Sequence, residues 1–211
     1  MSKHPYNIIL DLDQTLISAQ ATEEFDFIKN KQKSELFRHD DMDGYYVVYS
    51  RPHLQEFLDY IFKNFNVSIW TAATKDYALF IIDNIILNKQ SERHIDFIFF
   101  SYHCDISMYE KQHSKDLSIL WDLYKLTGYS KHNTVIIDDF VEDVHKCQPN
   151  NCIIAPPFEF LSDRSQEDIF LKELIPHLEQ MKKGMIRGQL RGNDSGNTEL
   201  AEKVNKNMKT K

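Results

Sequence analysis

The chain has 211 residues, of which 42% are hydrophobic and 27% are charged, and its formal net charge is −7. This composition is typical of a globular protein, and the negative charge argues against a general nucleic-acid-binding surface. Three cysteines are too few for a disulfide framework and fit a reducing compartment. Because no apolar run approaches the ~20 residues that span a bilayer, and the N-terminus lacks a signal-peptide core, we expect an intracellular soluble protein without a membrane partner.

The first predicted strand is followed immediately by two acidic residues. Ile8, Ile9 and Leu10 form a short apolar run that is typical of a buried strand, and Asp11 and Asp13 come directly after it. Open α/β folds bind their ligands at the carboxyl edge of the sheet. Burying an unpaired charge is expensive, so such residues are seldom placed there for stability. The pair is therefore a candidate functional site.

Residues 18 to about 50 are predicted to form an insertion with a small sheet of its own. Asp43 and Gly44 indicate a hairpin turn, and the aromatic and β-branched residues 45–49 indicate a strand. Ser50 is a candidate N-cap for an amphipathic helix over 51–64, with Pro52 in its first turn.

Strands and helices alternate through the rest of the chain. We expect strands at 67–70, 95–100, 134–137 and 152–155, and helices at 75–87, from 114 through 126, and at about 166–182, with a polar loop over 101–113. Tyr77 belongs to the apolar face of its helix, so we expect it in the core. Strands and helices in this order indicate an α/β fold, with a parallel sheet covered by helices on both faces.

The C-terminal stretch differs in composition from the rest. Residues 1–183 are expected to form one domain, and residues 184–211 a disordered tail, because the tail is rich in glycine and asparagine and poor in apolar residues. From Arg187 to Lys211 the tail has six basic and three acidic residues, a charge of +3, which leaves about −10 on the remainder.

Polar residues at the ends of separate elements are expected to converge. Asp11 and Asp13, Thr71, and Asp138 and Asp139 follow three predicted strands, and Lys115 begins a predicted helix. Four carboxylates that lie together repel one another and require a cation. Oxygen ligands without histidine or cysteine suit Mg²⁺, and a lysine and a hydroxyl beside it suit a phosphate.

Four ordered motifs resemble those of haloacid dehalogenase (HAD)-type phosphatases. They are Asp11-Leu12-Asp13-Gln14-Thr15-Leu16, Trp70-Thr71-Ala72-Ala73, Lys115-Asp116-Leu117 and Ile136-Ile137-Asp138-Asp139. The sequence around these motifs, including residues 51–58, is similar to that of phosphatases that act on the C-terminal domain of RNA polymerase II. These enzymes are also called NLI-interacting-factor-like phosphatases. The resemblance covers roughly residues 6–180, and it implies a Rossmann-like HAD fold with a small β-hairpin insertion after the first strand.

The resemblance implies a role for each motif residue. Asp11 would be the nucleophile that forms an aspartyl-phosphate, and Asp13 the general acid and then the general base. Thr71 and Lys115 would hold the phosphoryl oxygens.

The same resemblance implies an Mg²⁺ site. The ion would be bound by the Asp11 carboxylate, the backbone carbonyl of Asp13 and the Asp139 side chain. Asp138 would either bind the ion directly or contact the residues that bind it.

The implied activity is that of a phosphoserine or phosphothreonine protein phosphatase, with the polymerase C-terminal domain as the favoured substrate and the nucleus as the favoured compartment. An insertion this small leaves the site open, which favours a phosphorylated protein segment. Phe27, Tyr45 and Tyr46 either form an apolar pocket for such a segment or pack the insertion onto the core. The alternatives are another phosphoprotein or a small phosphomonoester as substrate, acted on in the cytoplasm, and a non-catalytic binding module. We expect a monomer.

Overall fold

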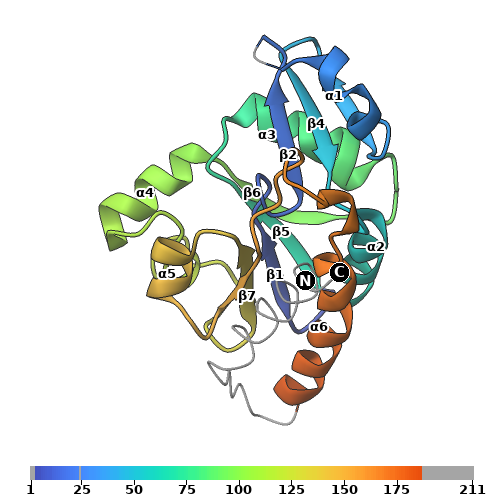
Figure 1. Cartoon of the computed structure of the whole chain (residues 1–211). Helices are drawn as coiled ribbons and strands as arrows, with labels where there is room; N and C mark the ends of the chain where they lie inside the picture. Colours follow the sequence, from blue (N-terminus) through green and yellow to red (C-terminus); the bar gives the residue numbers. More distant parts are fainter. Residues whose placement is uncertain (1–2, 24, 187–211) are drawn as a thin grey trace.

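A five-stranded parallel sheet forms the centre of the computed structural model, which describes residues 3–23 and 25–186 (Figure 1). In the order β6-β5-β1-β7-β8, the strands are β6 (Ile95–Phe99), β5 (Asn66–Trp70), β1 (Asn7–Leu10), β7 (Thr134–Asp138) and β8 (Cys152–Ile154). All four strand pairings are parallel. The predicted α/β fold is therefore confirmed, and β1 lies in the middle of the sheet.

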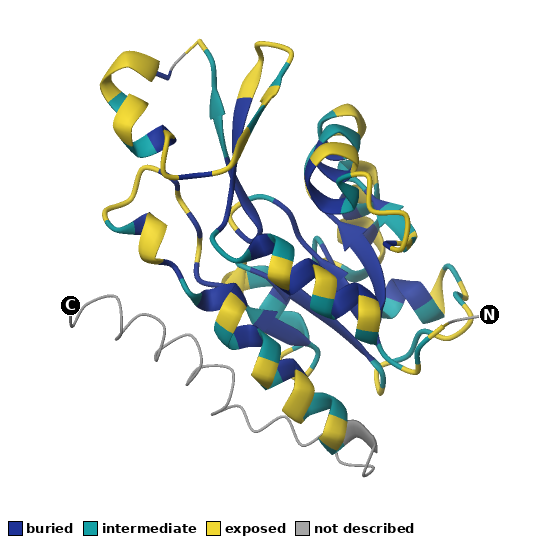
Figure 2. Cartoon of the chain, turned by 90° about the vertical axis from the view of Figure 1, so that its right-hand side faces the viewer, coloured by how far each residue is buried: buried dark blue, intermediate teal, exposed yellow. Residues whose placement is uncertain are grey.

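Helices cover both faces of this sheet, as predicted. One face is covered by α2 (Leu54–Asn64), α3 (Lys75–Ile81) with its π-helical continuation η1 (Ile82–Leu87), and α6 (Phe170–Ile186). The other face is covered by α4 (Ser101–Lys111), α5 (Ser118–Asp122) and the π turn η2 (Val141–His145). Ile8 and Leu10 pack into the first core and Ile9 into the second, because successive side chains of a strand point to opposite faces. Figure 2 shows the buried sheet between helices whose outer residues are exposed.

The insertion after β1 is a three-stranded antiparallel sheet with one helix. Its strands are β2 (Ile17–Ala21), β4 (Tyr46–Ser50) and β3 (His39–Met42), in the order β2-β4-β3, and α1 (Phe27–Ser34) lies beside them. The predicted turn is present, with positive φ at Asp43 and Gly44. Phe158 and Phe160, from the distant C-terminal segment, complete its apolar core. These two side chains thus pack the insertion against the main domain.

Two predicted features near the sheet edge are wrong. The expected loop 101–113 is mostly the helix α4, which begins where the side chain of His103 accepts a hydrogen bond from the backbone N–H of Phe100. The helix expected from 114 is only α5, which begins at Ser118, so Lys115 precedes a helix instead of starting one. A largely polar, half-exposed helix such as α4 lacks the apolar periodicity on which the prediction depends.

Helix boundaries also differ at two other places. Ser50 is the last residue of β4 and no N-cap, because α2 begins only at Leu54, with His53 in the N-cap position. The helix expected at 166–182 is a short 3-10 turn, η3 (Ser165–Glu167), followed by α6. Residues 184–186 belong to α6, and the rest of the expected tail, 187–211, lies outside the described residues.

Across residues 3–23 and 25–186, no helix combines the length and the apolar character that crossing a membrane requires.

A buried ion pair joins the start of α2 to the start of α6. The guanidinium of Arg51 donates to both carboxylate oxygens of Asp168, at 3.0 and 2.7 Å, and also to the backbone carbonyl of Thr15 at 2.9 Å. Arg51 is 1% exposed and Asp168 4% exposed, and the guanidinium lies 4.6 Å from the ring centroid of Phe170. A bidentate pair of this kind fixes both position and orientation, so it holds the loop that follows β1.

We expect Arg51→Met to lower the free energy of unfolding by about 3–5 kcal/mol, because it leaves the Asp168 carboxylate buried without a counter-charge. Urea denaturation measures this loss. Lys111→Met is the matched control, because Lys111 also pairs with an aspartate, Asp122, but at the surface. Its effect should be close to the error of the measurement. Equal effects of the two substitutions would contradict the stabilising role of the Arg51–Asp168 pair.

Candidate active site

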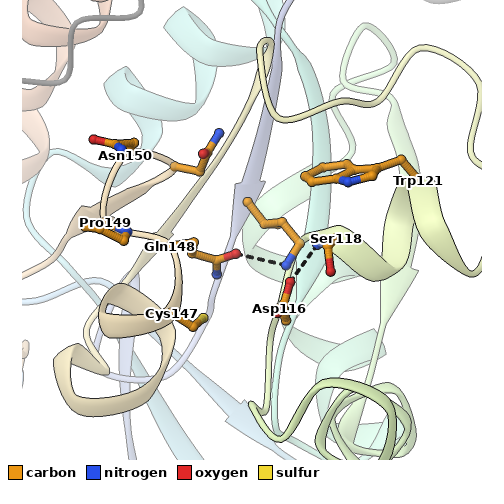
Figure 3. A pocket seen from close by; sticks show the side chains of 9 residues that line it. Asp116, Ser118, Trp121, Cys147, Gln148, Pro149 and Asn150 are labelled. Carbon is orange, nitrogen blue, oxygen red and sulfur yellow. Dashed lines mark hydrogen bonds between the residues drawn. The ribbon is translucent and has the colours of Figure 1, made fainter.

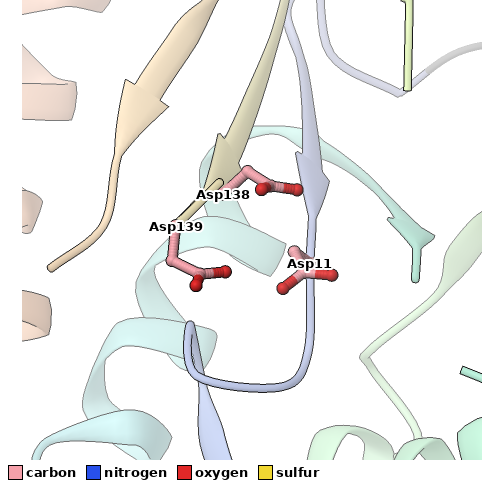
Figure 4. A group of neighbouring side chains, drawn as sticks. All are labelled: Asp11, Asp138 and Asp139. Carbon is pink, nitrogen blue, oxygen red and sulfur yellow. The ribbon is translucent and has the colours of Figure 1, made fainter. Parts of the chain in front are cut away.

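The register of the sheet brings three carboxylates together. Leu10 pairs with Ile137 in the parallel ladder, and the backbone N–H of Asp11 donates to the carbonyl of Ile137 at 3.0 Å, so Asp11 lies beside Asp138. Asp139 follows in the next loop. Carboxylate oxygens of Asp11, Asp138 and Asp139 lie within 4.8 Å of one another, and Figure 4 shows the three side chains gathered at the ends of β1 and β7.

Lys115 bridges two of these carboxylates. Its Nζ lies 2.6 Å from Oδ1 of Asp11 and 2.7 Å from Oδ2 of Asp138. All three residues are at most 5% exposed. Burial disfavours the charged form of Lys115, but Asp11 and Asp138 outweigh this effect and raise the pKa of the lysine. The side chain is therefore a buried ammonium ion.

One lysine does not neutralise three carboxylates. Burial raises the pKa of Asp11 to about 7, although Lys115 opposes this shift, and burial together with Asp138 raises the pKa of Asp139. The Thr15 hydroxyl lies 3.1 Å from Oδ2 of Asp11 and 3.4 Å from Oδ1 of Asp139. The negative excess and the all-oxygen donor set fit a hard divalent cation. The three aspartates are therefore a candidate acidic metal site.

Asp13 has a separate environment. The hydroxyl of Tyr77 donates to its Oδ1 at 2.6 Å. Burial raises the pKa of Asp13, while the Tyr77 and Lys115 side chains oppose this shift. The prediction that Tyr77 packs in the core is confirmed for its ring, and its hydroxyl in addition reaches Asp13. Helical periodicity identifies the face that a tyrosine occupies and gives no information on what its hydroxyl binds.

Thr71 lies at the carboxyl end of β5, the strand next to β1, and is 1% exposed. Its hydroxyl oxygen accepts a hydrogen bond from the backbone N–H of Ala73 at 3.1 Å. The structure therefore places Thr71 at the same sheet edge as Asp11, as predicted. None of the described hydrogen bonds joins the two side chains.

Two side chains that the sequence did not single out hold the segment that carries Lys115. Gln148 accepts from the backbone N–H of Leu117 at 2.9 Å and donates to the carbonyl of Lys115 at 2.7 Å. Asp143 accepts from the backbone N–H of Ser114 at 2.8 Å. Figure 3 shows Gln148 between the two chain segments, beside a hollow of about 370 Å³. Only the folded arrangement identifies these residues, because neither belongs to a recognisable motif.

The three aromatic residues predicted to line a substrate pocket have different surroundings in the insertion. Phe27 lines a hollow of about 390 Å³ together with other residues of α1 and His39. Tyr46 packs edge-on against Tyr77, with 5.5 Å between ring centroids, and Tyr45 is 71% exposed. A pocket shared by Phe27, Tyr45 and Tyr46 stays a prediction.

The strand order and the site together define the class of protein. A central strand that ends in two aspartates, a neighbouring strand that ends in two more and a lysine between them are the arrangement of HAD-type phosphatases. Residues 6–187 match the family described as NLI interacting factor-like phosphatase, and the chain belongs to this family.

Relatives with known names are consistent with this family. A C-terminal domain (CTD) phosphatase-like protein of Invertebrate iridescent virus 6 is 46% identical over 172 residues. These residues cover 80% of this chain and 94% of that protein. Its counterpart in Invertebrate iridescent virus 3 is 41% identical over 184 residues, covering 83% and 96%. Among solved structures, the fission yeast RNA polymerase II CTD phosphatase Fcp1 bound to beryllium fluoride has a TM-score of 0.51 at 22% identity. That match covers 85% of this chain and 52% of the yeast chain, and it supports the fold.

We expect a divalent cation to stabilise the folded protein, with Mg²⁺ as the probe. At a concentration about one hundred times its Kd, Mg²⁺ should raise Tm by about 5–10 °C, because it binds only the assembled carboxylates. Asp139→Asn should abolish most of this shift, whereas Asp83→Asn, at an exposed position on η1, should retain it. Differential scanning fluorimetry with Mg²⁺ or with chelator measures both. A full shift in Asp139→Asn would contradict the site.

Proposed function

We propose that the protein is an Mg²⁺-dependent phosphatase of phosphoserine or phosphothreonine in proteins, acting through an aspartyl-phosphate. The observation that carries this proposal is the difference between the surroundings of Asp11 and Asp13. Asp11 contacts the ammonium of Lys115 at 2.6 Å, which favours a carboxylate nucleophile. Asp13 contacts a neutral hydroxyl and is partly buried, which suits proton transfer. Pairs of carboxyl groups in unlike environments commonly divide acid–base roles in this way.

The chemistry then has two steps. In the first, an oxygen of Asp11 attacks phosphorus, and Asp13 donates its proton to the serine or threonine oxygen as that oxygen leaves. In the second, Asp13 accepts a proton from the attacking water, which releases phosphate and restores the Asp11 carboxylate. Lys115 and Thr71 hold phosphoryl oxygens and offset the charge that develops on them.

Mg²⁺ fits the oxygen donors at the sheet edge. Asp11, Asp139 and the backbone carbonyl of Asp13 would hold the ion. Asp138 suits a supporting role, because its Oδ2 accepts from Lys115 and its Oδ1 accepts from the backbone N–H of Phe140 at 2.9 Å. Among the described side chains, only Thr15 donates to Asp139, at 3.4 Å, and the other donor is the backbone of Asp139 itself. When bound, the ion supplies positive charge that offsets the phosphate and the carboxylates.

We expect Asp11→Asn to lower the hydrolysis of 4-nitrophenyl phosphate by about a thousandfold or more, because the amide is a poor nucleophile. Chelator should abolish wild-type activity, and Mg²⁺ should restore it. Asp83→Asn serves as the control with unchanged activity. Activity that persists in Asp11→Asn or in chelator would contradict the mechanism. A wild-type protein that hydrolyses no phosphate ester would instead favour a non-catalytic binding module.

The proposed substrate is a phosphorylated protein segment, with the C-terminal domain of RNA polymerase II favoured. Support comes from the names of the two viral relatives, which are CTD phosphatase-like proteins. Exposed aromatic side chains of the insertion, such as Tyr45, also offer contacts to a peptide. This substrate would place the activity in the nucleus, whereas another phosphoprotein or a small phosphomonoester would be compatible with the cytoplasm.

A panel of phosphopeptides tests this choice. We expect kcat/KM for phosphoserine peptides of the polymerase repeat to exceed that for unrelated phosphoserine peptides by about tenfold, equivalent to about 1.4 kcal/mol of transition-state binding. Peptides of equal length and net charge are the control for non-specific electrostatic attraction. Equal rates across the panel would point to another phosphoprotein, and faster hydrolysis of small phosphomonoesters than of any peptide would point to a small substrate.

A further inference from the structure

The side chain of Asp13 lies outside the acidic cluster and accepts a hydrogen bond from a side chain of another element. Asp13 lies in the loop after β1, and the metal-site cluster comprises only Asp11, Asp138 and Asp139 among the described residues. Among the described side chains, only Tyr77 donates a hydrogen bond to this carboxylate, at 2.6 Å, and the other donor is the backbone of Asp13 itself. The hydroxyl of Tyr77 is therefore the one contact from a separate element that orients the carboxylate among the described hydrogen bonds.

Tyr77 is itself held from two sides. It lies in the first turn of α3, and its ring packs against the main apolar core. The ring of Tyr46 also packs edge-on against it, with 5.5 Å between centroids and 80° between planes. Burial and Asp13 raise the pKa of Tyr77, so its hydroxyl keeps its proton and remains a donor.

Tyr46 connects this arrangement to the insertion. It is the first residue of β4, which forms the middle strand of the insertion sheet, and it is 39% exposed. Tyr46 of the insertion therefore contacts Tyr77, and Tyr77 in turn contacts Asp13. Edge-to-face contact is a preferred arrangement of aromatic rings, so Tyr46 favours the observed orientation of Tyr77.

We propose that Tyr77 is a positioning residue for the general acid Asp13 and that Tyr46 of the insertion supports Tyr77 in this role. This inference rests on the proposed phosphatase function. With Oδ1 held by Tyr77, Oδ2 is the oxygen that carries the transferable proton. That proton moves to the leaving oxygen as the bond from this oxygen to phosphorus breaks and the bond from Asp11 forms, and Tyr77 keeps its own proton throughout.

The consequence is a dependence on the leaving group. Phenyl phosphate releases a basic phenolate that needs protonation, whereas 4-nitrophenyl phosphate releases a stable anion that does not. The two substrates have the same ring and nearly the same size, so a loss of substrate binding affects both alike. For a two-step mechanism, kcat/KM reports only the steps up to phosphorylation of Asp11, so a change in the hydrolysis of the intermediate does not enter the comparison.

We expect Tyr77→Phe to lower kcat/KM for phenyl phosphate by about tenfold to a hundredfold, and for 4-nitrophenyl phosphate by less than about threefold, because a misplaced acid penalises only the basic leaving group. Tyr46→Ala should show the same selectivity with a smaller loss. The second variant keeps the test informative if Tyr77→Phe folds poorly, which circular dichroism and Tm would reveal.

Tyr129→Phe is the matched control. Its hydroxyl also donates to a carboxylate, Asp96, at 3.0 Å, but far along the sheet from Asp13, at the start of β6. It should leave the ratio of the two kcat/KM values unchanged. Equal losses on both substrates in Tyr77→Phe and Tyr46→Ala would overturn the positioning role while leaving the phosphatase function intact. A wild-type protein inactive on both substrates would overturn the phosphatase function, and this inference with it.

Discussion

The buried ammonium of Lys115 is the interaction on which the site depends. The parallel register of β1 and β7 places Asp11 beside Asp138 whether or not a charge compensates them. Two carboxylates in this position would otherwise favour protonation over ionisation, because burial disfavours charge. Lys115 lies within 2.7 Å of both and compensates part of this cost. The sheet therefore supplies the geometry of the site, and Lys115 makes that geometry compatible with ionised groups.

The position of Lys115 depends in turn on hydrogen bonds to its backbone. Because α5 begins only at Ser118, Lys115 lies before the helix and is not positioned by it. Gln148 and Asp143, both from the stretch between β7 and β8, hold this segment through its backbone. The same stretch of chain follows Asp138 and Asp139, so the carboxylates and the lysine are positioned by one connected region.

The sequence was sufficient to predict the sheet and the motif residues, because buried parallel strands are short apolar runs and the polar residues that end them stand out. Side-chain partners were harder to predict. Arg51 reads as a helix-start residue, and its pairing with Asp168, 117 positions away, follows only from the fold. The sequence predicts Tyr77 in the core, and its ring does pack there. The hydrogen bond from its hydroxyl to Asp13 follows only from the fold. The helix α4 was missed because its half-exposed face has little apolar periodicity.

The C-terminal segment before α6 has a consequence for the order of folding. The backbone N–H of Phe158 donates to the carbonyl of Gln14, within the loop that carries the aspartates, and that of Phe160 donates to the hydroxyl of Ser18. These contacts join residues more than 140 positions apart. Contacts of such long sequence separation form late and slowly, because chain entropy opposes them. During synthesis, the loop and the insertion core would therefore stay incomplete until nearly the whole domain had left the ribosome.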